Sequence, residues 1–289
     1  MSRPLVSQLW SCLEASPARP PAVQAGLVCG FLESVLDAGA LQLERLGHVG
    51  RVRSKSAARD LVTETDVACE RMLVARLREL APDHAIEAEE EVHDAARDAA
   101  GSGLRWFIDP LDGTVNFVHG LASFGISAAL YDGPTPLFGV VHAPRLGETF
   151  IAARGAGAWL AAGGLPPQRL AVSSTDTLGE AVLGTGFPYR RGELAHSNLE
   201  NFGRFFYDVR DLRRMGSAAL DLACVAAGRL DGFWELHLAP HDVAAGALLV
   251  REAGGLVSDA DGGDAWLRDG HIVAAGPGLA AAIRERIRH

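Results

Sequence analysis

Two segments in the second half of the chain are almost entirely apolar, unlike a surface helix with one polar face. Residues 217–227 and 243–253 are rich in Ala and Leu. Gly228 and Gly254 stand directly after them, where a helix end favours glycine. Because a helix that is hydrophobic all round must be covered all round, both segments predict helices packed between layers of other structure.

Before these two segments, the chain changes from helical to strand-like patterns. Apolar residues recur at helical spacing over residues 23–46, and a second helix is expected between Thr65, as its N-cap, and Pro82. Short apolar runs bounded by turn residues predict strands at residues 106–108, 124–131, 137–142, 170–173 and 181–185. This order of elements, without an internal repeat or a long linker, predicts a layered α+β or α/β fold.

The composition excludes several classes of protein. With 289 residues, of which 48% are hydrophobic, the chain is neither disordered nor fibrous. The 27 Lys and Arg against 36 Asp and Glu give a net charge of −9 without a basic run, so we expect no direct binding of nucleic acid. No apolar run approaches the roughly 18 residues of a membrane span, and we expect no signal peptide. The cysteines form no C-x-x-C pair, which favours reduced thiols in a cytoplasmic protein.

An acidic turn follows the first of the predicted strands. Asp109 and Asp112 belong to the run D-P-L-D-G-T, where the end of a strand could direct both carboxylates to one cation. Gly113 allows close approach of the backbone, and the N–H groups of Gly113 and Thr114 could face an anion. The same residues are typical of a solvated turn, so their spacing leaves both interpretations open.

Four further charged positions are ambiguous on their own. Glu89 is the first of three consecutive glutamates, which most simply form a solvated loop. Asp242 follows Pro240 at the start of an apolar helix, where an acid commonly complements the helix dipole. Lys55 and Asp66 could be an ordinary surface charge and a helix cap.

Together these stretches resemble the inositol monophosphatase family of Mg²⁺-dependent, Li⁺-sensitive sugar phosphatases. The hallmark D-P-[LI]-D-G-T-x-N-F is matched in full at residues 109–117. The signature W-D-x-A-A-G-x-L-L-x-x-E-A-G-G is matched up to Gly255, with His241 in place of the leading Trp. K-S-x-x-x-D-L-V-T-x-T-D is matched at residues 55–66, and Ala88 precedes the glutamates where the family has Gly.

The resemblance spans roughly residues 25–285 and is greatest for the bacterial extragenic-suppressor type of inositol-1-monophosphatase. It implies an α+β fold, a layered αβαβα sandwich of the inositol monophosphatase and fructose-1,6-bisphosphatase type. We expect one such domain over residues 1–289, with a metal-binding half at about 22–175 and a second half at about 176–289.

The resemblance also implies a site for two or three Mg²⁺ ions. Glu89, Asp109 and the backbone carbonyl of Leu111 would hold the first ion. Asp109, Asp112 and Asp242 would hold the second. Such a pair of ions can stabilise both the attacking and the leaving oxygen of an in-line displacement.

Catalytic roles follow from the same resemblance. A water molecule on the first ion would attack the phosphorus, oriented by Thr114 and Glu89. Asp66 would hydrogen-bond to the Thr114 hydroxyl, and Lys55 would be a charge that modulates the first metal. No covalent enzyme intermediate is implied.

Substrate contacts are implied in two groups. The phosphate would rest on the N–H groups of Gly113 and Thr114, beside Asp112 and Asp242. The inositol ring would contact the turn formed by Gly216, Ser217 and Ala218, and it would also contact Glu235. An acid at Glu235 suits a polyol and disfavours a second phosphate by charge repulsion.

Two positions depart from the family pattern. Ala88 would be strained if the family Gly has a positive φ. His241 is either a volume substitution at a packing position or a group that hydrogen-bonds to Asp242 and orients it. Because further glutamates follow Glu89, a shift of one residue at this ligand is also conceivable.

The resemblance implies a homodimeric phosphomonoesterase that acts on inositol 1-phosphate. Alternatives with the same metal site are phosphatases of histidinol phosphate, fructose 1,6-bisphosphate or 3′-phosphoadenosine 5′-phosphate. An alternative of another class is a binding protein: enterobacterial relatives act with transcription antitermination factors, so Arg213 and Arg214 could belong to a protein interface.

Overall fold

The computed structural model describes residues 2–48, 50, 52–55, 60–92 and 103–289. The helices in these ranges are α1 (Ser2–Glu14), α2 (Ala25–Arg45), α3 (Glu64–Leu80), α5 (Thr114–Val118), a 3-10 turn (Leu178–Glu180), α6 (Leu199–Phe205), α7 (Ala218–Ala226), α8 (Pro240–Glu252), α9 (Trp266–Asp269) and α10 (Ala280–Arg284). The strands are β1 (Val52–Ser54), β2 (Leu61–Thr63), β3 (Ala85–Ala88), β4 (Leu104–Asp112), β5 (Gly125–Asp132), β6 (Thr135–Ala143), β7 (Glu148–Ala153), β8 (Gly157–Ala162), β9 (Gln168–Arg169), β10 (Val182–Thr185), β11 (Asp211–Arg213), β12 (Gly232–Glu235), β13 (Leu256–Ser258) and β14 (Ile272–Ala275).

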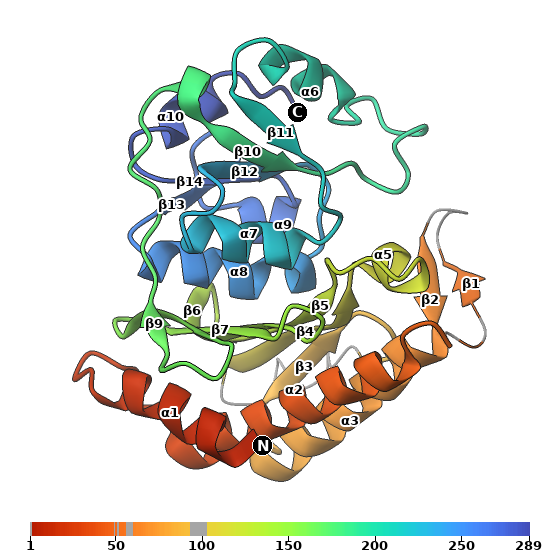
Figure 1. Cartoon of the computed structure of the whole chain (residues 1–289), viewed down its shortest axis with the longest axis vertical. Helices are drawn as coiled ribbons and strands as arrows, with labels where there is room; N and C mark the ends of the chain where they lie inside the picture. The colour runs from red at the N-terminus through yellow and green to blue at the C-terminus, as the bar shows by residue number, and fades with distance from the viewer. Residues whose placement is uncertain (1, 49, 51, 56–59, 93–102) are drawn as a thin grey trace.

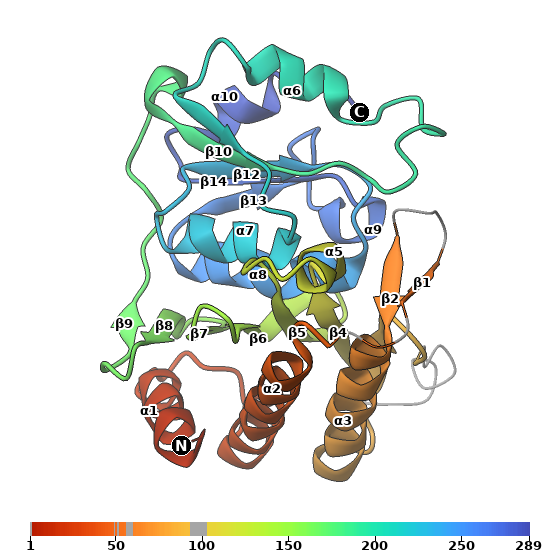
Figure 2. The ribbon, with the colours of Figure 1, turned by 45° about the vertical axis from the view of Figure 1, so that its right-hand side comes forward.

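Layers of helix and sheet alternate through the molecule (Figure 1). Helices α1, α2 and α3 lie side by side under a seven-stranded sheet of order β3-β4-β5-β6-β7-β8-β9 (Figure 2). Helices α7 and α8 separate this sheet from a five-stranded sheet of order β11-β10-β12-β14-β13. Helices α6 and α10 cover the outer face of the second sheet. The expected αβαβα architecture is confirmed.

Strand β4 shows how the large sheet serves two cores. Trp106 and Ile108 belong to the cluster that includes residues of α1, α2 and α3. Phe107 belongs to the cluster formed with α7 and α8. Successive side chains of a strand point to opposite faces, so one strand contributes to both. Most residues of α7 and α8 are buried, which confirms that the two apolar segments are interior helices.

The sequence placed the start of α3 at the wrong threonine. The N-cap is Thr63, whose side chain accepts a hydrogen bond from the N–H of Thr65. The Asp66 carboxylate accepts the N–H of Thr63 in return, at 3.0 Å, which completes a capping box. Thr63 is preferred as the N-cap because Asp66 lies three residues after it and can accept the reciprocal bond. The residue three after Thr65 is Ala68, whose side chain has no acceptor.

The strand expected at residues 170–173 is absent from the structure, although these residues are described. The N–H of Leu170 still bonds to Ala158 of β8, at 2.8 Å. The chain then leaves the sheet, and the N–H of Val172 bonds to Ala253 at the end of α8. The apolar run therefore connects two layers and does not extend the sheet.

Helix α2 reaches the length and mean hydropathy of a membrane span, contrary to the expectation that no segment would. Half of its most apolar window is buried inside the structure. Val28, Phe31 and Val35 pack in the cluster that includes Trp106 of β4. Its hydrophobicity is therefore accounted for by its place between the sheet and the neighbouring helices.

Candidate metal and phosphate site

Three aspartates from two elements meet at the C-terminal end of β4. One carboxylate oxygen from each of Asp109, Asp112 and Asp242 lies within 4.8 Å of the other two. Residues 109 and 112 would point to opposite faces of a regular strand. The pairing of β4 with β5 shifts register between them, and such an irregularity re-aims side chains. The shift therefore lets both carboxylates of the D-P-L-D run converge on Asp242.

Backbone N–H groups orient each of these carboxylates. The three bonds are Leu111 N to Asp109 Oδ1 (2.9 Å), Ala219 N to Asp112 Oδ2 (2.7 Å) and Ala239 N to Asp242 Oδ2 (2.7 Å). Ser217, the N-cap of α7, donates a further bond to Asp112 at 2.6 Å. The cluster is therefore held in place by β4, α7 and α8 together.

The electrostatics of the three carboxyls suit a divalent cation. Burial raises the pKa of Asp109 well above its usual range, and the charges of Glu89 and Asp112 raise it further. Burial and the charge of Asp242 raise the pKa of Asp112 to about 7. Burial also raises the pKa of Asp242, although His241 lowers it in part. The cluster offers only oxygen ligands, and its raised pKa values show that the carboxyls resist ionisation when no positive charge is near. A hard cation such as Mg²⁺ would supply that charge.

Glu89 lies next to this cluster but outside the group of described residues whose oxygens meet. Lys55 Nζ donates to Glu89 Oε1 at 2.8 Å and to Glu90 Oε1 at 2.5 Å. Burial alone would raise the pKa of Glu89, but the charges of His241 and Lys55 outweigh burial and lower it. Glu89 is therefore the group of this region that most readily stays ionised.

Glu70 of α3 is a positioning residue that sequence reasoning missed. Its fully buried carboxylate accepts the N–H groups of Glu90 (2.7 Å), Glu91 (2.7 Å) and Val92 (3.1 Å). These bonds fix the turn that presents Glu89. The sequence signal for this role was an acidic residue next to Cys69, on the side of α3 that carries buried apolar residues.

Ala88 shows no strain, because Asn198 and His237 are the only described residues other than Gly with positive φ.

Thr114 and Asp66 form the expected pair. The Thr114 hydroxyl lies 3.0 Å from Asp66 Oδ1 and 3.1 Å from the carbonyl oxygen of Leu111, and it can donate to either. Asp66 is fully buried, and burial raises its pKa to about 6. Gly113 precedes Thr114 with φ 89°, and a Cβ there would lie 2.7 Å from the carbonyl oxygen of Ser123. Only glycine fits this turn.

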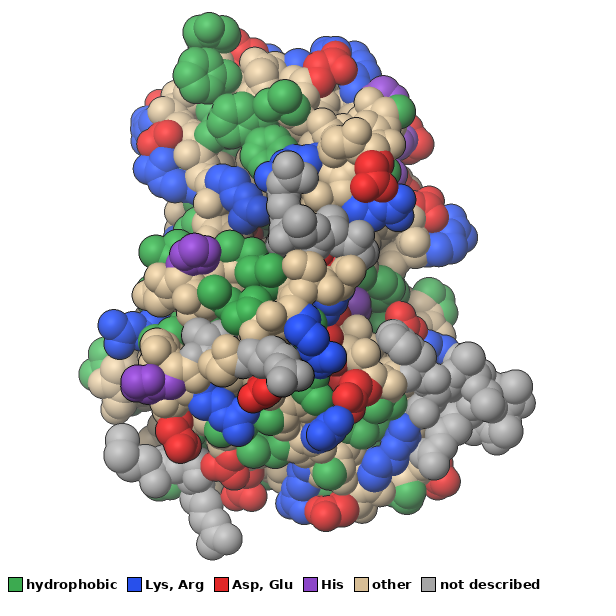
Figure 3. Space-filling view, turned by 90° about the vertical axis from the view of Figure 1, so that its right-hand side faces the viewer, with side chains coloured by type: hydrophobic (Ala, Val, Ile, Leu, Met, Phe, Trp, Pro, Cys, Tyr) green, Lys and Arg blue, Asp and Glu red, His purple; other side chains and the backbone are tan. Residues whose placement is uncertain are grey.

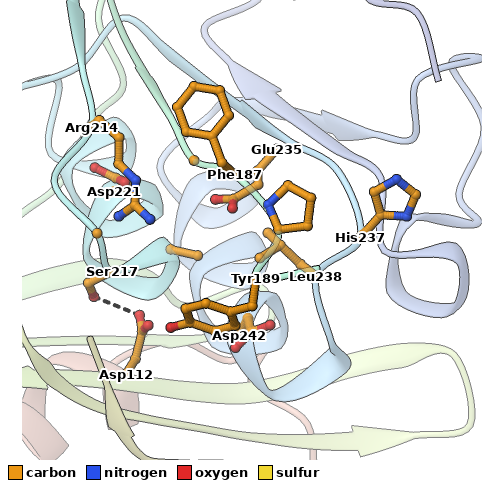
Figure 4. A pocket seen from close by; sticks show the side chains of 14 residues that line it. Asp112, Phe187, Tyr189, Arg214, Ser217, Asp221, Glu235, His237, Leu238 and Asp242 are labelled. Atoms are coloured by element: carbon orange, nitrogen blue, oxygen red, sulfur yellow. Dashed lines mark hydrogen bonds between the residues drawn. The ribbon is translucent and has the colours of Figure 1, made fainter. Parts of the chain in front are cut away.

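A cavity of about 100 Å³ opens beside the aspartates (Figure 4). The predicted residues that line it are Asp112, Gly216, Ser217, Ala218, Glu235 and Asp242. Those that sequence reasoning did not assign to it are Gly186, Phe187, Pro188, Tyr189, Arg214, Asp221, His237 and Leu238. The predicted residues outside the lining of this cavity are Lys55, Asp66, Glu89, Asp109, Leu111, Gly113 and Thr114. Among them, Lys55 bonds to Glu89 and Thr114 bonds to Asp66.

The end of the cavity away from the aspartates carries Glu235, Asp221 and Arg214. Burial raises the pKa of Glu235 to about 8, although Arg214 lowers it in part. Asp221 Oδ1 is buried without a hydrogen-bond partner among the described residues. Burial and the charge of Glu235 raise the pKa of Asp221 well above its usual range. This end offers carboxyl groups that can donate as well as accept hydrogen bonds.

His241 does not orient Asp242. Its Nε2 atom lies 3.8 Å from Asp242 Oδ1, which is too far for a hydrogen bond. The N–H of Ala239 holds Asp242 instead. The carbonyl of His241 accepts a bond from Ser127 of β5 at 3.1 Å, so this residue connects α8 to the large sheet through its backbone.

Comparisons with known proteins agree with this geometry. Residues 29–288 match the inositol monophosphatase family. The Nus factor SuhB of Pseudomonas aeruginosa is 45% identical over 251 residues, covering 84% of this chain and 89% of that protein. The solved extragenic suppressor protein suhB of Bartonella henselae has a TM-score of 0.80 at 35% identity, covering 89% of this chain and 96% of its own. The Thermotoga maritima IMPase has a TM-score of 0.77 at 35% identity, covering 88% and 93%.

The matched region contains both halves of the cavity and the three converging aspartates. The motif at residues 109–117 lies in β4, Gly113 and α5. The chain therefore belongs to the inositol monophosphatase family.

Proposed function

We propose that this protein is a Mg²⁺-dependent phosphomonoesterase whose substrate is inositol 1-phosphate. The observation that carries the proposal is the convergence of Asp109, Asp112 and Asp242 within 4.8 Å. Family membership and the IMPase neighbour support a phosphatase. The metal ligands would be these three aspartates with Glu89 and the Leu111 carbonyl, for two or three ions.

Bound Mg²⁺ would supply positive charge to the phosphate oxygens and lower the pKa of the attacking water. The residues of the chain would orient that water and receive its proton. Thr114 and Glu89 would position the water, and the Thr114 hydroxyl would pass a proton to Asp66, 3.0 Å away. A pKa of about 6 suits Asp66 to accept this proton near neutral pH. Lys55 would hold Glu89 in place through their 2.8 Å bond.

The substrate would lie across the cavity from the aspartates to Glu235. Its phosphate would take the N–H groups of Gly113 and Thr114, near Asp112 and Asp242. Its ring hydroxyls would contact the turn at Gly216, Ser217 and Ala218, and the Glu235 carboxyl at the far end. Ser217 already donates to Asp112, so its hydroxyl connects the two ends of the site.

The test is Mg²⁺-dependent phosphate release from inositol 1-phosphate, histidinol phosphate, fructose 1,6-bisphosphate and 3′-phosphoadenosine 5′-phosphate. We expect the highest kcat/KM for inositol 1-phosphate, loss of activity in Asp109→Asn, and inhibition by Li⁺. Asp83→Asn, at an exposed aspartate, is the matched control and should retain activity. Preference for another substrate would move the assignment within the family. No release from any substrate would overturn it.

The charge of Glu235 affects how well the cavity could accept a substrate with two phosphates. With a pKa of about 8, its carboxyl is largely uncharged at neutral pH. Charge repulsion therefore disfavours a second phosphate less than the sequence alone indicated. The panel above measures this directly, because fructose 1,6-bisphosphate and 3′-phosphoadenosine 5′-phosphate both carry one.

A second candidate function is favoured by the relatives named Nus factor SuhB. For this chain, an interface with transcription antitermination factors would include Arg213 and Arg214. Arg213 is exposed and pairs with Asp211 at 2.5 Å. On the face shown in Figure 3, Lys and Arg are interspersed with Asp and Glu. A pull-down with RNA polymerase and elongation factors, compared between wild type and Arg213→Glu, tests this role; equal or absent recovery would contradict it.

We also propose a homodimer in the cytoplasm. All four cysteines are free, which accords with a reducing compartment. Light scattering after size-exclusion chromatography measures the mass directly, and a mass near the 30.5 kDa of one chain would contradict the dimer.

A further inference from the structure

The segment that follows β10 forms one wall of the cavity and carries none of the proposed metal ligands. Its residues Phe187, Pro188 and Tyr189 all line the cavity. Asn198, at the far end of this segment, donates to the carbonyl of Gly186 at 2.6 Å and to Thr185 Oγ1 at 3.0 Å. The segment is therefore anchored where it leaves the sheet and where it returns to α6.

Packing and a tight turn further fix the position of Tyr189. The ring of Phe187 packs against Phe202 of α6, with 5.8 Å between ring centroids. The N–H of Arg191 bonds to the carbonyl of Pro188 at 3.1 Å, so Tyr189 lies inside a turn. These contacts fix the backbone on both sides of Tyr189, whose side chain lines the cavity and is 39% exposed.

The Tyr189 hydroxyl faces the proposed metal site. In Figure 4 its ring lies between Asp112 and Asp242, with the hydroxyl end toward Asp112. Burial raises the pKa of Tyr189, and the charges of Asp112 and Asp242 raise it further. The phenol therefore keeps its proton and remains a donor at neutral pH. Within the described part of the chain, no residue accepts a hydrogen bond from it.

The Tyr189 hydroxyl is thus a hydrogen-bond donor beside the aspartate cluster, and a ligand can supply its acceptor. When cations neutralise the aspartates, the group that occupies this space is the phosphate of the substrate. Phosphate oxygens are strong acceptors, and a phenol that is already in position loses little entropy on donating to one.

We propose that the Tyr189 hydroxyl donates a hydrogen bond to a phosphate oxygen of the substrate, so that Tyr189 is a substrate-contacting residue of this site. This inference rests on the proposed function. It assigns the phenol to the phosphate and not to the polyol, because in Figure 4 the hydroxyl end of Tyr189 points toward Asp112, a proposed metal ligand. The polyol end of the cavity, at Glu235, has other donors.

The test compares wild type, Tyr189→Phe and Tyr207→Phe. Tyr189→Phe removes the hydroxyl and keeps the ring, whereas Tyr207 is 89% exposed and does not line the cavity. With Mg²⁺ present, we expect Tyr189→Phe to weaken binding of inorganic phosphate about ten- to a hundred-fold by calorimetry. The kcat/KM for inositol 1-phosphate should fall by a similar factor. Tyr207→Phe should match wild type in both, and all three proteins should have the same Tm.

A spectroscopic measurement distinguishes contact from packing. The chain has three tyrosines, so tyrosine absorbance changes can be assigned by substitution. Phosphate should change the tyrosine absorbance of wild type and Tyr207→Phe, and it should leave that of Tyr189→Phe unchanged. A signal that persists in Tyr189→Phe would overturn the proposal.

The outcomes also separate this inference from the proposed function. If wild type binds and releases phosphate and Tyr189→Phe does so equally well, the role of Tyr189 is wrong and the function stands. If Tyr189→Phe lowers kcat/KM for inositol 1-phosphate but does not weaken the binding of inorganic phosphate, the phenol contacts the polyol. That result would overturn the assignment to phosphate. If wild type neither binds phosphate nor hydrolyses any phosphomonoester, both proposals fail.

Discussion

The acidic residues of the site share a chemical type but differ in what surrounds them. Asp109, Asp112 and Asp242 each accept a backbone N–H, and one oxygen of each lies within 4.8 Å of the others. Asp66 is bound on both oxygens, by Thr63 and by Thr114. The first arrangement leaves ligand atoms available to a cation, whereas the second suits a group that exchanges a proton with its neighbour.

Replacing Thr114 tests this difference between the aspartates. Thr114→Val removes the hydroxyl that connects Asp66 to the site, so we expect kcat for inositol 1-phosphate to fall about 100-fold. Thr114→Ser keeps the hydroxyl and is the matched control. Steady-state kinetics of both variants give the answer, and equal kcat values for the two would remove Thr114 from the proton path.

At the level of elements, the N-terminus of α3 serves both the fold and the site. Thr63 caps the helix, and its capping partner Asp66 is the residue that bonds to Thr114. The same helix carries Glu70, which fixes the turn around Glu90. A change at the start of α3 therefore affects stability and catalysis together.

Two threonines at this helix start should respond in opposite ways to the same substitution. Thr63→Val removes the N-cap acceptor and should cost about 1 kcal/mol of unfolding free energy. Thr65 Oγ1 is buried without a partner in the described structure, so Thr65→Val should be neutral or stabilising. Urea denaturation of both variants measures the difference. A larger loss for Thr65→Val would show that the cap is misassigned.

For the whole molecule, the interior helices join the two sheets. One core cluster contains Phe107 of the large sheet, Phe233 of the small sheet, and Leu222 and Leu248 of α7 and α8. We therefore propose that residues 1–289 form one domain, as the sequence indicated. Neither the half before about residue 175 nor the half after it could cover both faces of α7 and α8 alone.

The charge balance of the whole site predicts how stability depends on pH. Burial raises the pKa of Asp66 to about 6, of Asp112 to about 7 and of Glu235 to about 8. Their protonated forms stabilise the fold fully below their unfolded pKa values, and this contribution is lost as pH rises through those folded values. Glu89, whose pKa is lowered, opposes this trend only below the ordinary glutamate pKa of 4.5. Burial lowers the pKa of His142 to about 4, so His142 opposes the trend up to its ordinary value of 6.5, and the three carboxyls together outweigh it above pH 5.

Without divalent cations, Tm should therefore fall between pH 5 and pH 8 by roughly 5 °C or more. Excess Mg²⁺ should reduce the fall, because a cation replaces the protons. Differential scanning fluorimetry in EDTA and in Mg²⁺ measures both curves. A Tm that rises with pH in EDTA would contradict the assigned pKa shifts.

The sequence predicted those parts of the site that lie in continuous motifs. Asp109, Asp112 and Thr114 stand within nine residues, and the apolar pattern after Asp242 identified its helix. Tyr189 and Asp221 were missed because their roles depend on which distant segments border one cavity. That arrangement follows from the stacking of two sheets and is not encoded in local spacing.

The same limit applied to the fold. Interior helices and strands β4, β5, β6 and β10 have strong apolar patterns and were predicted. Helix α1 and the inner strands β7, β8, β12 and β14 were not anticipated, and the run at 170–173 was misread. In α1, alternation with polar residues weakens the signal, and its burial depends on contact with β8 and α2. In residues 170–173, the apolar side chains pack where the chain passes between layers.

Mg²⁺ activation of phosphate release from inositol 1-phosphate, compared between wild type, Asp112→Asn and Asp83→Asn, tests most directly whether the aspartate cluster holds a catalytic cation. Release by wild type and Asp83→Asn should rise with Mg²⁺ to saturation and stop in EDTA. Asp112→Asn should be slower by at least about 100-fold, because a ligand of the cluster is lost. Release that continues in EDTA, or that is unchanged in Asp112→Asn, would show that the aspartate cluster does not hold a catalytic cation.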